Sequence, residues 1–301
     1  MGLVSGKVAL VTGASRGIGK GVALGLGREG ARVIVAARSL DRSTATKAPD
    51  GKPLPGSLAE TVADLEAAGA AATAIRCDLT NAADIDNLVA EAIETAGRID
   101  ILVANAAPQT PVDGATWDLA VAAYDEAMAL GPRSAYLLAR AAAPRMLRAG
   151  RGLIVAVSAS VAAVGAGYST AFGASCATTD RVIQGIADEL RPHGVAAISL
   201  WPRLVATERV LMAASGEDLG FTVGSDFDEK RDTDTPEVHG RAIAHLAADP
   251  DVMRVSGKVQ IVSDLAARYG FTDIDGRVPQ PSPRVLAMRK ERGSIAPTAY
   301  D

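Results

Sequence analysis

Seven short runs of apolar residues recur along the chain, and each run is nearly continuous in hydrophobicity and rich in β-branched side chains. An unbroken run of this kind predicts a strand that is covered on both faces, as strands of a parallel sheet are. The predicted strands are 7–13, 31–38, 72–78, 99–105, 152–158, 194–202 and 257–263.

The segments between these strands carry apolar positions three and four residues apart, which predicts amphipathic helices. Strands that alternate with helices indicate an α/β fold: a single Rossmann-type, doubly wound domain with right-handed crossovers and a parallel sheet of about seven strands. We expect this domain to span residues 1–268. The predicted helices are 17–29, 57–68, 81–96, 118–149, 173–191 and 236–248.

Three stretches interrupt the alternation. Residues 39–56 form a polar insert rich in Pro and Gly after the second strand. Residues 205–235 are too long for a plain connection, and loops of that length are usually lids or binding elements, so we expect a substrate lid there. Residues 269–301 form a polar tail with several prolines, which we expect to drape over the domain or to be partly disordered.

Composition narrows the classes of partner. The net charge is −4 and the 31 lysines and arginines are scattered, which gives no support for a nucleic-acid surface. Two cysteines argue against a disulfide framework and fit a reducing compartment. The chain shows no secretory leader at its start and no apolar run near the roughly 18 residues of a membrane span. We therefore expect a cytoplasmic protein with neither a membrane nor a nucleic-acid partner.

The stretch "TGASRGIG", residues 12–19, lies where the first predicted strand gives way to a helix. Gly13 permits a tight turn, Gly17 lets the backbone approach a pyrophosphate, and Gly19 lets the helix pack closely on the strand. The positive end of the helix then faces the anion. The predicted cofactor contacts in this stretch are Gly13, Ser15, Arg16, Gly17, Ile18 and Gly19.

The end of the second strand indicates which dinucleotide binds. A NAD site would place an Asp or Glu there for the ribose hydroxyls, whereas this strand ends in "AAR". Arg38 and Arg16 could together clamp a 2′-phosphate, which favours NADP(H) over NAD(H). The alternative is that both are solvated surface arginines.

Together with "CDLT" (77–80) and "LVANAA" (102–107), this loop resembles the short-chain dehydrogenase/reductase (SDR) family over about residues 5–265. The segments "HGV" (193–195), "LWP" (200–202) and "DLAARYGFTDIDGR" (264–277) further resemble the branch of that family labelled SDR family member one. Ala104, Ala107 and Arg203 depart from the family's usual Asn, Gly and Gly. The cofactor contacts that the resemblance implies are Asp78, Leu79, Asn105, Ala106, Ala107, Pro202 and Thr207.

The resemblance also implies a proton-donating Tyr, a Lys one helical turn later that lowers its pKa, a Ser that polarises the carbonyl, and an Asn that holds a water relay. Alignment of "FGASC" with the family's Tyr-x-x-x-Lys places Phe172 at the Tyr and Cys176 at the Lys, while Gly131 falls at the Asn. Phe has no proton to give, and Cys carries no fixed positive charge. The usual reductase mechanism is therefore disfavoured.

Several groups could replace the lost donor. Ser158 and Ser160 flank Ala159, which stands at the commonest spacing for the catalytic Ser, and Tyr168 precedes Phe172 by one turn. The alternative for Tyr168 is packing against a lid or a neighbouring subunit, and a Ser at the end of a strand often caps a turn. Cys176 lacks a base nearby in sequence, so burial is favoured over a role as nucleophile. We predict no metal site, and we expect surface roles for the histidines His193, His239 and His245.

Three functions remain open at this point. The first is an NADP(H)-dependent oxidoreductase with a non-standard active site. The second is a cofactor-binding protein without turnover, and the third is a non-redox enzyme on the same fold, such as a dehydratase or cyclase. The partly apolar lid suggests a hydrophobic small-molecule substrate or ligand. The family's habit implies a homodimer or homotetramer formed through 118–149 and 173–191.

Overall fold

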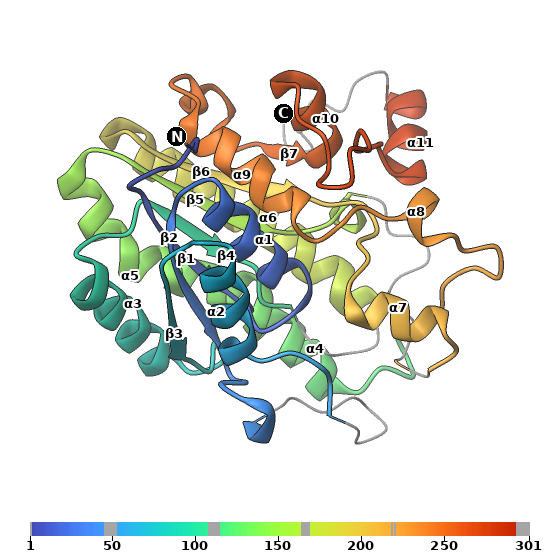
Figure 1. Ribbon diagram of the computed structural model, residues 1–301. Coiled ribbons are helices and arrows are strands. Elements are labelled where there is room, and N and C mark those ends of the chain that lie inside the picture. Colours follow the sequence, from blue (N-terminus) through green and yellow to red (C-terminus); the bar gives the residue numbers. More distant parts are fainter. Residues whose placement is uncertain are drawn as a thin grey trace.

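The computed structural model describes residues 2–44, 53–107, 115–163, 169–217, 219 and 221–292. Its centre is one parallel sheet with the strand order β3-β2-β1-β4-β5-β6-β7 (Figure 1). All seven predicted strands are confirmed, which makes the fold a Rossmann-type doubly wound α/β domain. The strands are β1 Val8–Thr12, β2 Arg32–Ala37, β3 Ala72–Arg76, β4 Ile101–Ala104, β5 Gly152–Val157, β6 Val195–Trp201 and β7 Val259–Ile261.

The strand order reverses between β1 and β4, which are neighbours in the sheet although two strands separate them in sequence. Successive crossovers leave this point in opposite directions, so a crevice opens at the carboxyl ends of the two strands. Every residue of β1 and β4 is buried, as expected for strands with helices on both faces. The cavity described below lies at this place.

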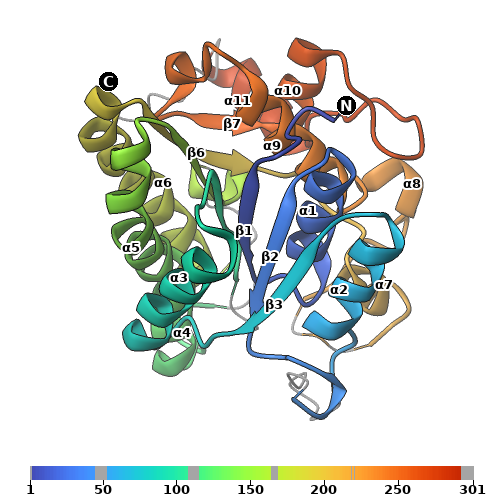
Figure 2. The ribbon, with the colours of Figure 1, turned by 60° about the vertical axis from the view of Figure 1, so that its left-hand side comes forward.

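Helices cover both faces of the sheet in two layers (Figure 2). One layer of helices packs on one face of the sheet and forms the first hydrophobic core with it. The other layer packs on the opposite face over a second core. The first layer consists of α1 Gly17–Arg28, α2 Leu58–Ala67, α9 Val238–Ala248 and α10 Val262–Tyr269. The second consists of α3 Ala82–Ala96, α5 Ser134–Ala149 and α6 Thr170–Leu190, and α4 Val121–Met128 packs against α6.

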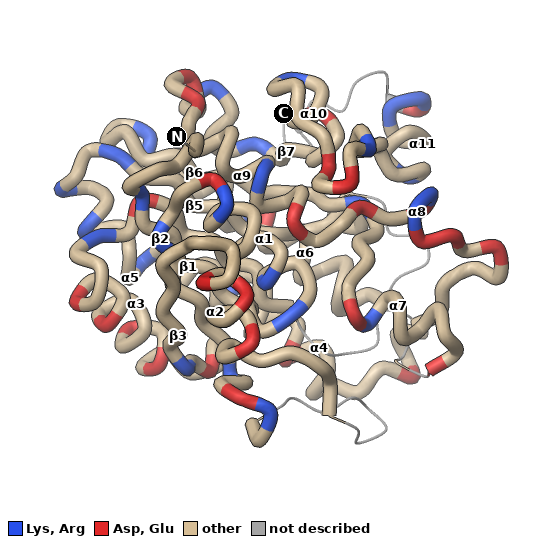
Figure 3. The backbone as a smooth tube through the Cα atoms, in the orientation of Figure 1, with Lys and Arg blue, Asp and Glu red and all other residues tan. Residues whose placement is uncertain are grey.

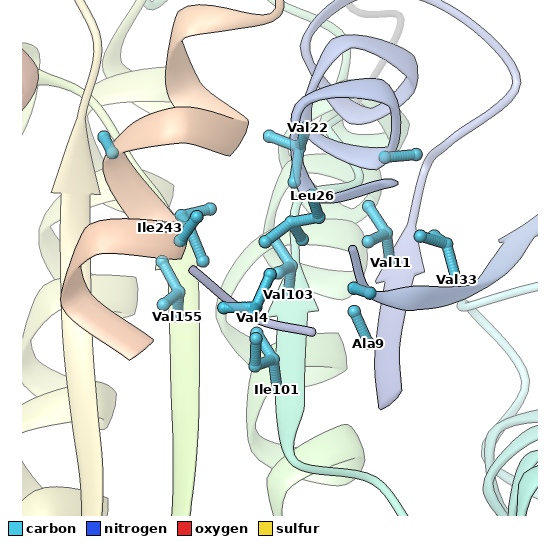
Figure 4. Close-up of a cluster of buried hydrophobic side chains, with 14 of the residues drawn as sticks. Val4, Ala9, Val11, Val22, Leu26, Val33, Ile101, Val103, Val155 and Ile243 are labelled. Carbon is cyan, nitrogen blue, oxygen red and sulfur yellow. The ribbon is translucent and has the colours of Figure 1, made fainter. Parts of the chain in front are cut away.

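The first core is built from small and β-branched side chains (Figure 4). Leu26 of α1 and Ile243 of α9 are fully buried with Val103 of β4 among them. The two helices cross so closely that a Cβ on Gly25 would lie 2.8 Å from the Cα of Gly240. These glycines therefore let α1 and α9 pack side by side over the centre of the sheet.

The prediction of one continuous helix over 118–149 is wrong. Two helices, α4 and α5, are separated by a π-helical turn, Ala129–Arg133, which contains Pro132. Proline lacks the N–H that a regular α-helical turn needs, so the helix widens there. The helix predicted at 173–191 starts three residues earlier, because Ser169 accepts a hydrogen bond from the backbone N–H of Phe172 and caps α6 at Thr170.

One of the three histidines contradicts the expectation of a surface role. His239 of α9 is completely buried, and its Nδ1 lies 3.1 Å from the carbonyl oxygen of Pro236. Burial lowers the pKa of this imidazole to about 4, so it is neutral at pH 7. His193 is exposed and His245 is half-buried, stacked on Tyr269.

The lid and the described end of the tail lie on the same side of the molecule, on the right in Figure 1. The lid contains two short helices, α7 Glu208–Ala214 and α8 Glu229–Asp232. The described part of the tail ends in a helix, α11 Pro283–Arg292, whose Val285 and Met288 pack on Trp201 of β6. The tail therefore docks on the domain as a helix up to residue 292.

Candidate active site

A cavity of about 1370 Å³ opens at the carboxyl ends of β1, β4 and β5. The loop between β1 and α1, the segment from β5 into α6, the lid, and the tail at Pro281 to Arg284 line much of it, and residues just after β2, β3 and β4 and in the turn between α4 and α5 complete the lining. The cofactor contacts predicted from sequence that line it are Gly13, Ser15, Arg16, Gly17, Ile18, Arg38, Leu79, Asn105, Ala106, Ala107, Pro202 and Thr207.

The glycine loop has the backbone that its sequence predicts. Gly13 and Gly17 have φ angles of +64° and +55°, in the left-handed region that side chains with a Cβ rarely adopt. Gly19 lies beneath the loop instead of on the cavity wall, and a Cβ there would stand 2.3 Å from the carbonyl oxygen of Gly13. Asn105 fixes the loop to the end of β4, because its Nδ2 donates to the Thr12 carbonyl at 3.1 Å.

Two arginines stand at the nucleotide end of the cavity. Arg16 donates from Nε to the Pro55 carbonyl at 2.7 Å and from a second nitrogen to the Gly56 carbonyl, so the insert holds it. Burial lowers the pKa of Arg16, the Glu208 carboxylate opposes that shift, and the charge of Arg38 adds to it. Arg38 is half-buried on the cavity wall at the end of β2.

Asp78, predicted to contact the adenine, is not among the residues on the cavity wall, although its neighbours Cys77 and Leu79 are. Its carboxylate accepts hydrogen bonds from the N–H and the hydroxyl of Thr80 at 3.0 and 2.8 Å. The side chain thus shapes the turn after β3, while Leu79 presents an apolar surface to the cavity.

The predicted catalytic positions lie on the opposite wall. Phe172 and Cys176, one turn apart on α6, both line the cavity. Burial raises the pKa of the Cys176 thiol to about 12, and the charge of Asp180 adds to the shift. A thiol with this pKa is neutral at pH 7, so Cys176 is neither a cation nor an activated nucleophile.

Gly131 occupies the π-helical turn between α4 and α5 and faces α6. A Cβ at this position would lie 2.2 Å from the Ser175 hydroxyl oxygen. That hydroxyl donates to the carbonyl of Ala127 at 2.8 Å and ties α6 to the end of α4. Ser175 therefore fills the space beside Gly131, and any larger residue there would have to displace it.

The two serines that follow β5 have different surroundings. Ser158 is buried, and its hydroxyl donates to the Cys176 carbonyl at 3.2 Å, so it fastens the strand to α6. Ser160 begins a short 3-10 turn, is half-buried and lines the cavity. Of the two, Ser160 is the one whose hydroxyl is not bonded to a helix carbonyl in the described structure. Tyr168 lies outside the described residues.

A carboxyl group that the sequence motifs did not indicate lies behind the wall formed by Phe172 and Cys176, which we call the catalytic wall. Asp180 follows Cys176 by one turn on α6, and its Oδ2 accepts a hydrogen bond from the Trp201 indole at 3.0 Å. Burial raises the pKa of Asp180 to about 6, although the hydroxyls of Ser199 and Ser158 and the indole oppose the shift. The i, i+4, i+8 spacing of Phe172, Cys176 and Asp180 was the available signal.

The lid is clamped where it leaves and rejoins the domain. Nε of Arg203, at the position where the family commonly has Gly, lies 3.0 Å from Oδ1 of Asp234, and both side chains are largely buried. Val205 forms a parallel β-bridge with Asp234 at the same place. Burial raises the pKa of Asp234 to about 6, against the attraction of Arg203.

The insert and the lid meet over the glycine loop. Leu54 of the insert and Leu219 of the lid form a small buried cluster with Met212 and Phe221. The sequence could not show this contact, because it joins two segments about 165 residues apart whose ends are fixed only by the folded sheet.

Within the described residues, no group of three or more His, Cys, Asp or Glu side chains could hold a metal ion. Among the same residues, no helix combines the length and the hydropathy that crossing a bilayer requires.

Comparison with known proteins gives consistent matches. The sequence model of the short chain dehydrogenase family matches residues 7–217. The mouse protein dehydrogenase/reductase SDR family member 1 is 35% identical over 285 residues, covering 91% of this chain and 85% of the mouse protein, and its human counterpart is 33% identical over 282 residues, with the same coverage.

Solved structures agree with these matches. A crystal structure from Xanthomonas campestris, provisionally assigned as a dehydrogenase, has a TM-score of 0.74 and 29% identity, covering 93% of this chain and 97% of that one. A metagenomic short-chain oxidoreductase in complex with NADP has a TM-score of 0.66 and 28% identity, covering 86% of this chain and 97% of that one.

Proposed function

Because this chain belongs to the short-chain dehydrogenase/reductase family, a family of oxidoreductases, we propose that it is an NADP(H)-dependent oxidoreductase with a non-standard active site. The observation that carries the proposal is the glycine loop with its cavity. Gly13 and Gly17 adopt backbone angles that favour glycine, Gly19 has no room for a Cβ, and the loop opens on a cavity of about 1370 Å³.

The residues present fit a dinucleotide phosphate. Gly17 is the first residue of α1, and its N–H already binds an anion, the Glu208 carboxylate, at 2.9 Å. The helix dipole favours negative charge at the same point. Gly13, Gly17 and Ile18 would hold the pyrophosphate, and Asn105, Ala106, Ala107, Pro202 and Thr207 would enclose the rest of the cofactor.

Arg38 and Arg16 support the preference for NADP(H) over NAD(H). Both line the cavity, and each lies close enough to influence the other electrostatically. Two neighbouring guanidinium groups repel each other unless an anion lies between them, and a 2′-phosphate would supply that anion. A metagenomic relative of the same family was solved with NADP bound.

A bound nicotinamide would supply hydride, so the protein must provide for the proton and for substrate orientation. Phe172 and Cys176 stand where the family has Tyr and Lys, and neither can donate a proton readily at pH 7. We assign the hydrogen bond to the substrate oxygen to Ser160, since this residue lines the cavity and the Ser158 hydroxyl is bonded to the Cys176 carbonyl. Water in the cavity would then supply the proton.

The proposed substrate is a hydrophobic small molecule. Away from the glycine loop, apolar and aromatic side chains line the cavity, and they come from α6, the lid and the turn after β5. These residues are Val161, Phe172, Leu204, Phe221, Val223 and Phe227. Exposed Tyr124 on α4 and Tyr136 on α5 favour assembly as a homodimer or homotetramer through that layer. Two free, buried cysteines fit the reducing environment of the cytoplasm.

Calorimetric titration with NADPH and NADH tests the cofactor. We expect NADPH to bind more tightly, because only it carries the 2′-phosphate. Reduction of a panel of apolar ketones and aldehydes, followed by nicotinamide absorbance, tests the chemistry. Tight binding without hydride transfer to any compound would favour a cofactor-binding protein without turnover. A product formed without a change in nicotinamide would favour a non-redox enzyme.

A further inference from the structure

The first turn of the lid helix α7 touches the glycine loop. Oε2 of Glu208, the first residue of α7, accepts a hydrogen bond from the backbone N–H of Gly17 at 2.9 Å. Thr207, which caps α7 through its hydroxyl, would lie 3.4 Å from a Cβ on Gly17. The lid thus reaches the backbone group that would meet a phosphate.

The backbone N–H of Gly17 has no hydrogen-bond acceptor within its own helix. The first four N–H groups of a helix lack intrahelical acceptors, and the residue before α1, Arg16, provides no side-chain cap. An anion satisfies such a group and is favoured by the helix dipole. The Glu208 carboxylate therefore occupies a position of the kind that phosphate oxygens take.

Arg209, the second residue of α7, follows Glu208 directly and lies on the cavity wall. Its guanidinium lies 5.4 Å above the Phe221 ring and donates to the Leu219 carbonyl at 3.3 Å. No ion pair joins it to a carboxylate within the described ranges of the chain. Burial lowers the pKa of Arg209, the nearby charge of Arg16 lowers it further, and the Glu126 carboxylate opposes both effects.

Helix α7 therefore begins with an acidic residue followed by a basic one, Glu208 and Arg209 (Figure 3). Arg38, Arg16 and Arg209 form a row of guanidinium groups in which each neighbour repels the next, and all three line the cavity with Glu208. A ligand with several phosphate groups would neutralise this row, and Glu208 is the carboxylate on the cavity wall that supports the charge of Arg16.

We infer that α7 is part of the cofactor phosphate site: Glu208 holds the place of a phosphate oxygen on the N–H of Gly17, and Arg209 binds the diphosphate once that carboxylate is displaced. The inference rests on the proposed NADP(H) function. It assigns opposite roles to two consecutive lid residues, since Glu208 competes with the cofactor and Arg209 attracts it.

Two substitutions that change charge with little change of shape separate these roles. Glu208→Gln keeps an oxygen that can accept from Gly17 but removes the charge, so we expect it to bind NADPH about tenfold more tightly than the wild type. Arg209→Gln removes the cation, so we expect about tenfold weaker binding. Calorimetry at low and high salt measures both, and the two differences should shrink as salt rises.

The matched controls are Glu217→Gln on the same lid and Arg148→Gln, an exposed residue of α5. Neither residue lines the cavity. Both controls should bind NADPH as the wild type does. Thermal unfolding checks that Arg209→Gln, which loses its contact with Phe221, remains folded. An α7 with a merely structural role would shift both lid variants in the same direction.

Unchanged or weaker NADPH binding by Glu208→Gln overturns the inference, and so does unchanged binding by folded Arg209→Gln. If the wild type binds neither NADPH nor NADH, the proposed function is wrong. Inorganic diphosphate then serves as the probe for α7 alone. Equal affinity of the wild type and Glu208→Gln for diphosphate would refute the role of Glu208 as a competitor.

Discussion

The two walls of the cavity differ in what their side chains can do. On the wall around the loop between β1 and α1, a backbone N–H, glycines without room for a Cβ and the arginines in this loop, at the end of β2 and on α7 suit a polyanion. On the wall formed by β5 and α6, Phe172 is apolar, the Cys176 thiol is neutral at pH 7, and the Ser158 hydroxyl is bonded to the backbone.

If the proposed function is right, the difference means that one fold can keep a dinucleotide site while the residues for proton transfer change. The wall around the loop between β1 and α1, which we call the phosphate wall, depends mainly on backbone geometry. The packing of α1 on the sheet holds that geometry in place. The catalytic wall depends on the identity of a few side chains on α6, and these can change while the helix stays in place. The fold and the glycine loop therefore identify the family, whereas the reaction depends on the side chains of the catalytic wall.

Restoring the family's residues at the catalytic wall tests the comparison most strongly. We expect the double variant Phe172→Tyr with Cys176→Lys to raise the rate of NADPH-dependent reduction of a generic ketone by about 10²–10⁴-fold, the usual contribution of a general acid. Asp180, one turn beyond, would offset the burial of the new ammonium group, since its charge already acts on Cys176.

Steady-state kinetics measures this gain, with Phe172→Tyr alone as the control, because a Tyr without its Lys should gain much less. If the folded double variant binds NADPH and is no faster, the catalytic wall is limited by something other than these two positions.

The phosphate wall should be sensitive to a single added methyl group. In Gly19→Ala, the new Cβ would meet the Gly13 carbonyl oxygen at 2.3 Å and Nδ2 of Asn105 at 2.4 Å, so the loop must shift. We expect a loss of about 2–3 kcal/mol in NADPH binding, or about a hundredfold in Kd, measured by calorimetry.

Gly185→Ala on α6 is the matched control, because its Cβ would approach only the mobile end of Arg181, at 3.3 Å. Alanine favours a helix, so this variant should bind NADPH normally and be as stable as the wild type or up to about 1 kcal/mol more stable. Normal NADPH binding by Gly19→Ala would show that the loop does not contact the cofactor.

Arg38→Gln should sharpen the choice of dinucleotide. The loss of one charge-assisted contact to a 2′-phosphate should weaken NADPH binding by about tenfold to thirtyfold and leave NADH binding unchanged. Calorimetry with both coenzymes measures the ratio. An equal loss for NADPH and NADH would mean that Arg38 does not recognise the 2′-phosphate.

The smallest effect concerns the buried acid behind the catalytic wall. The pKa of Asp180 is about 6 in the folded protein against an ordinary value of 3.8, so the folded state binds more protons between these pH values. The contribution of Asp180 to stability is then complete below about pH 4 and is lost as the pH rises through 6. Asp180→Asn should be more stable at pH 7 by on the order of 1–2 kcal/mol.

Urea unfolding at pH 4 and pH 7 measures this difference, and the advantage of Asp180→Asn over the wild type should disappear at pH 4. Asp234, whose pKa is also raised to about 6, acts equally in both proteins and cancels from the comparison. A constant advantage at both pH values would mean that titration of Asp180 does not cause it.

Local sequence patterns determined the seven strands, their helices and the glycine loop, because burial on both faces of a parallel strand leaves a continuous apolar run that is visible in the chain. The resemblance to the family's Tyr-x-x-x-Lys motif located Phe172 and Cys176. The local patterns did not predict that the helix expected over 118–149 is interrupted at Pro132, where it widens into a π-helical turn. Nor did they predict the burial of His239, which depends on the packing of α9 against α1.

Only the tertiary structure brought Glu208 to Gly17, Leu54 to Leu219 and Asp180 to Trp201. Each pair joins residues from different elements, some of them far apart in the chain, and the meeting follows from how α6, the insert and the lid are placed around the sheet. A sequence records which groups can bind an anion or hold a proton. Whether they meet depends on packing, because a hydrogen bond requires its atoms within about 3 Å of each other.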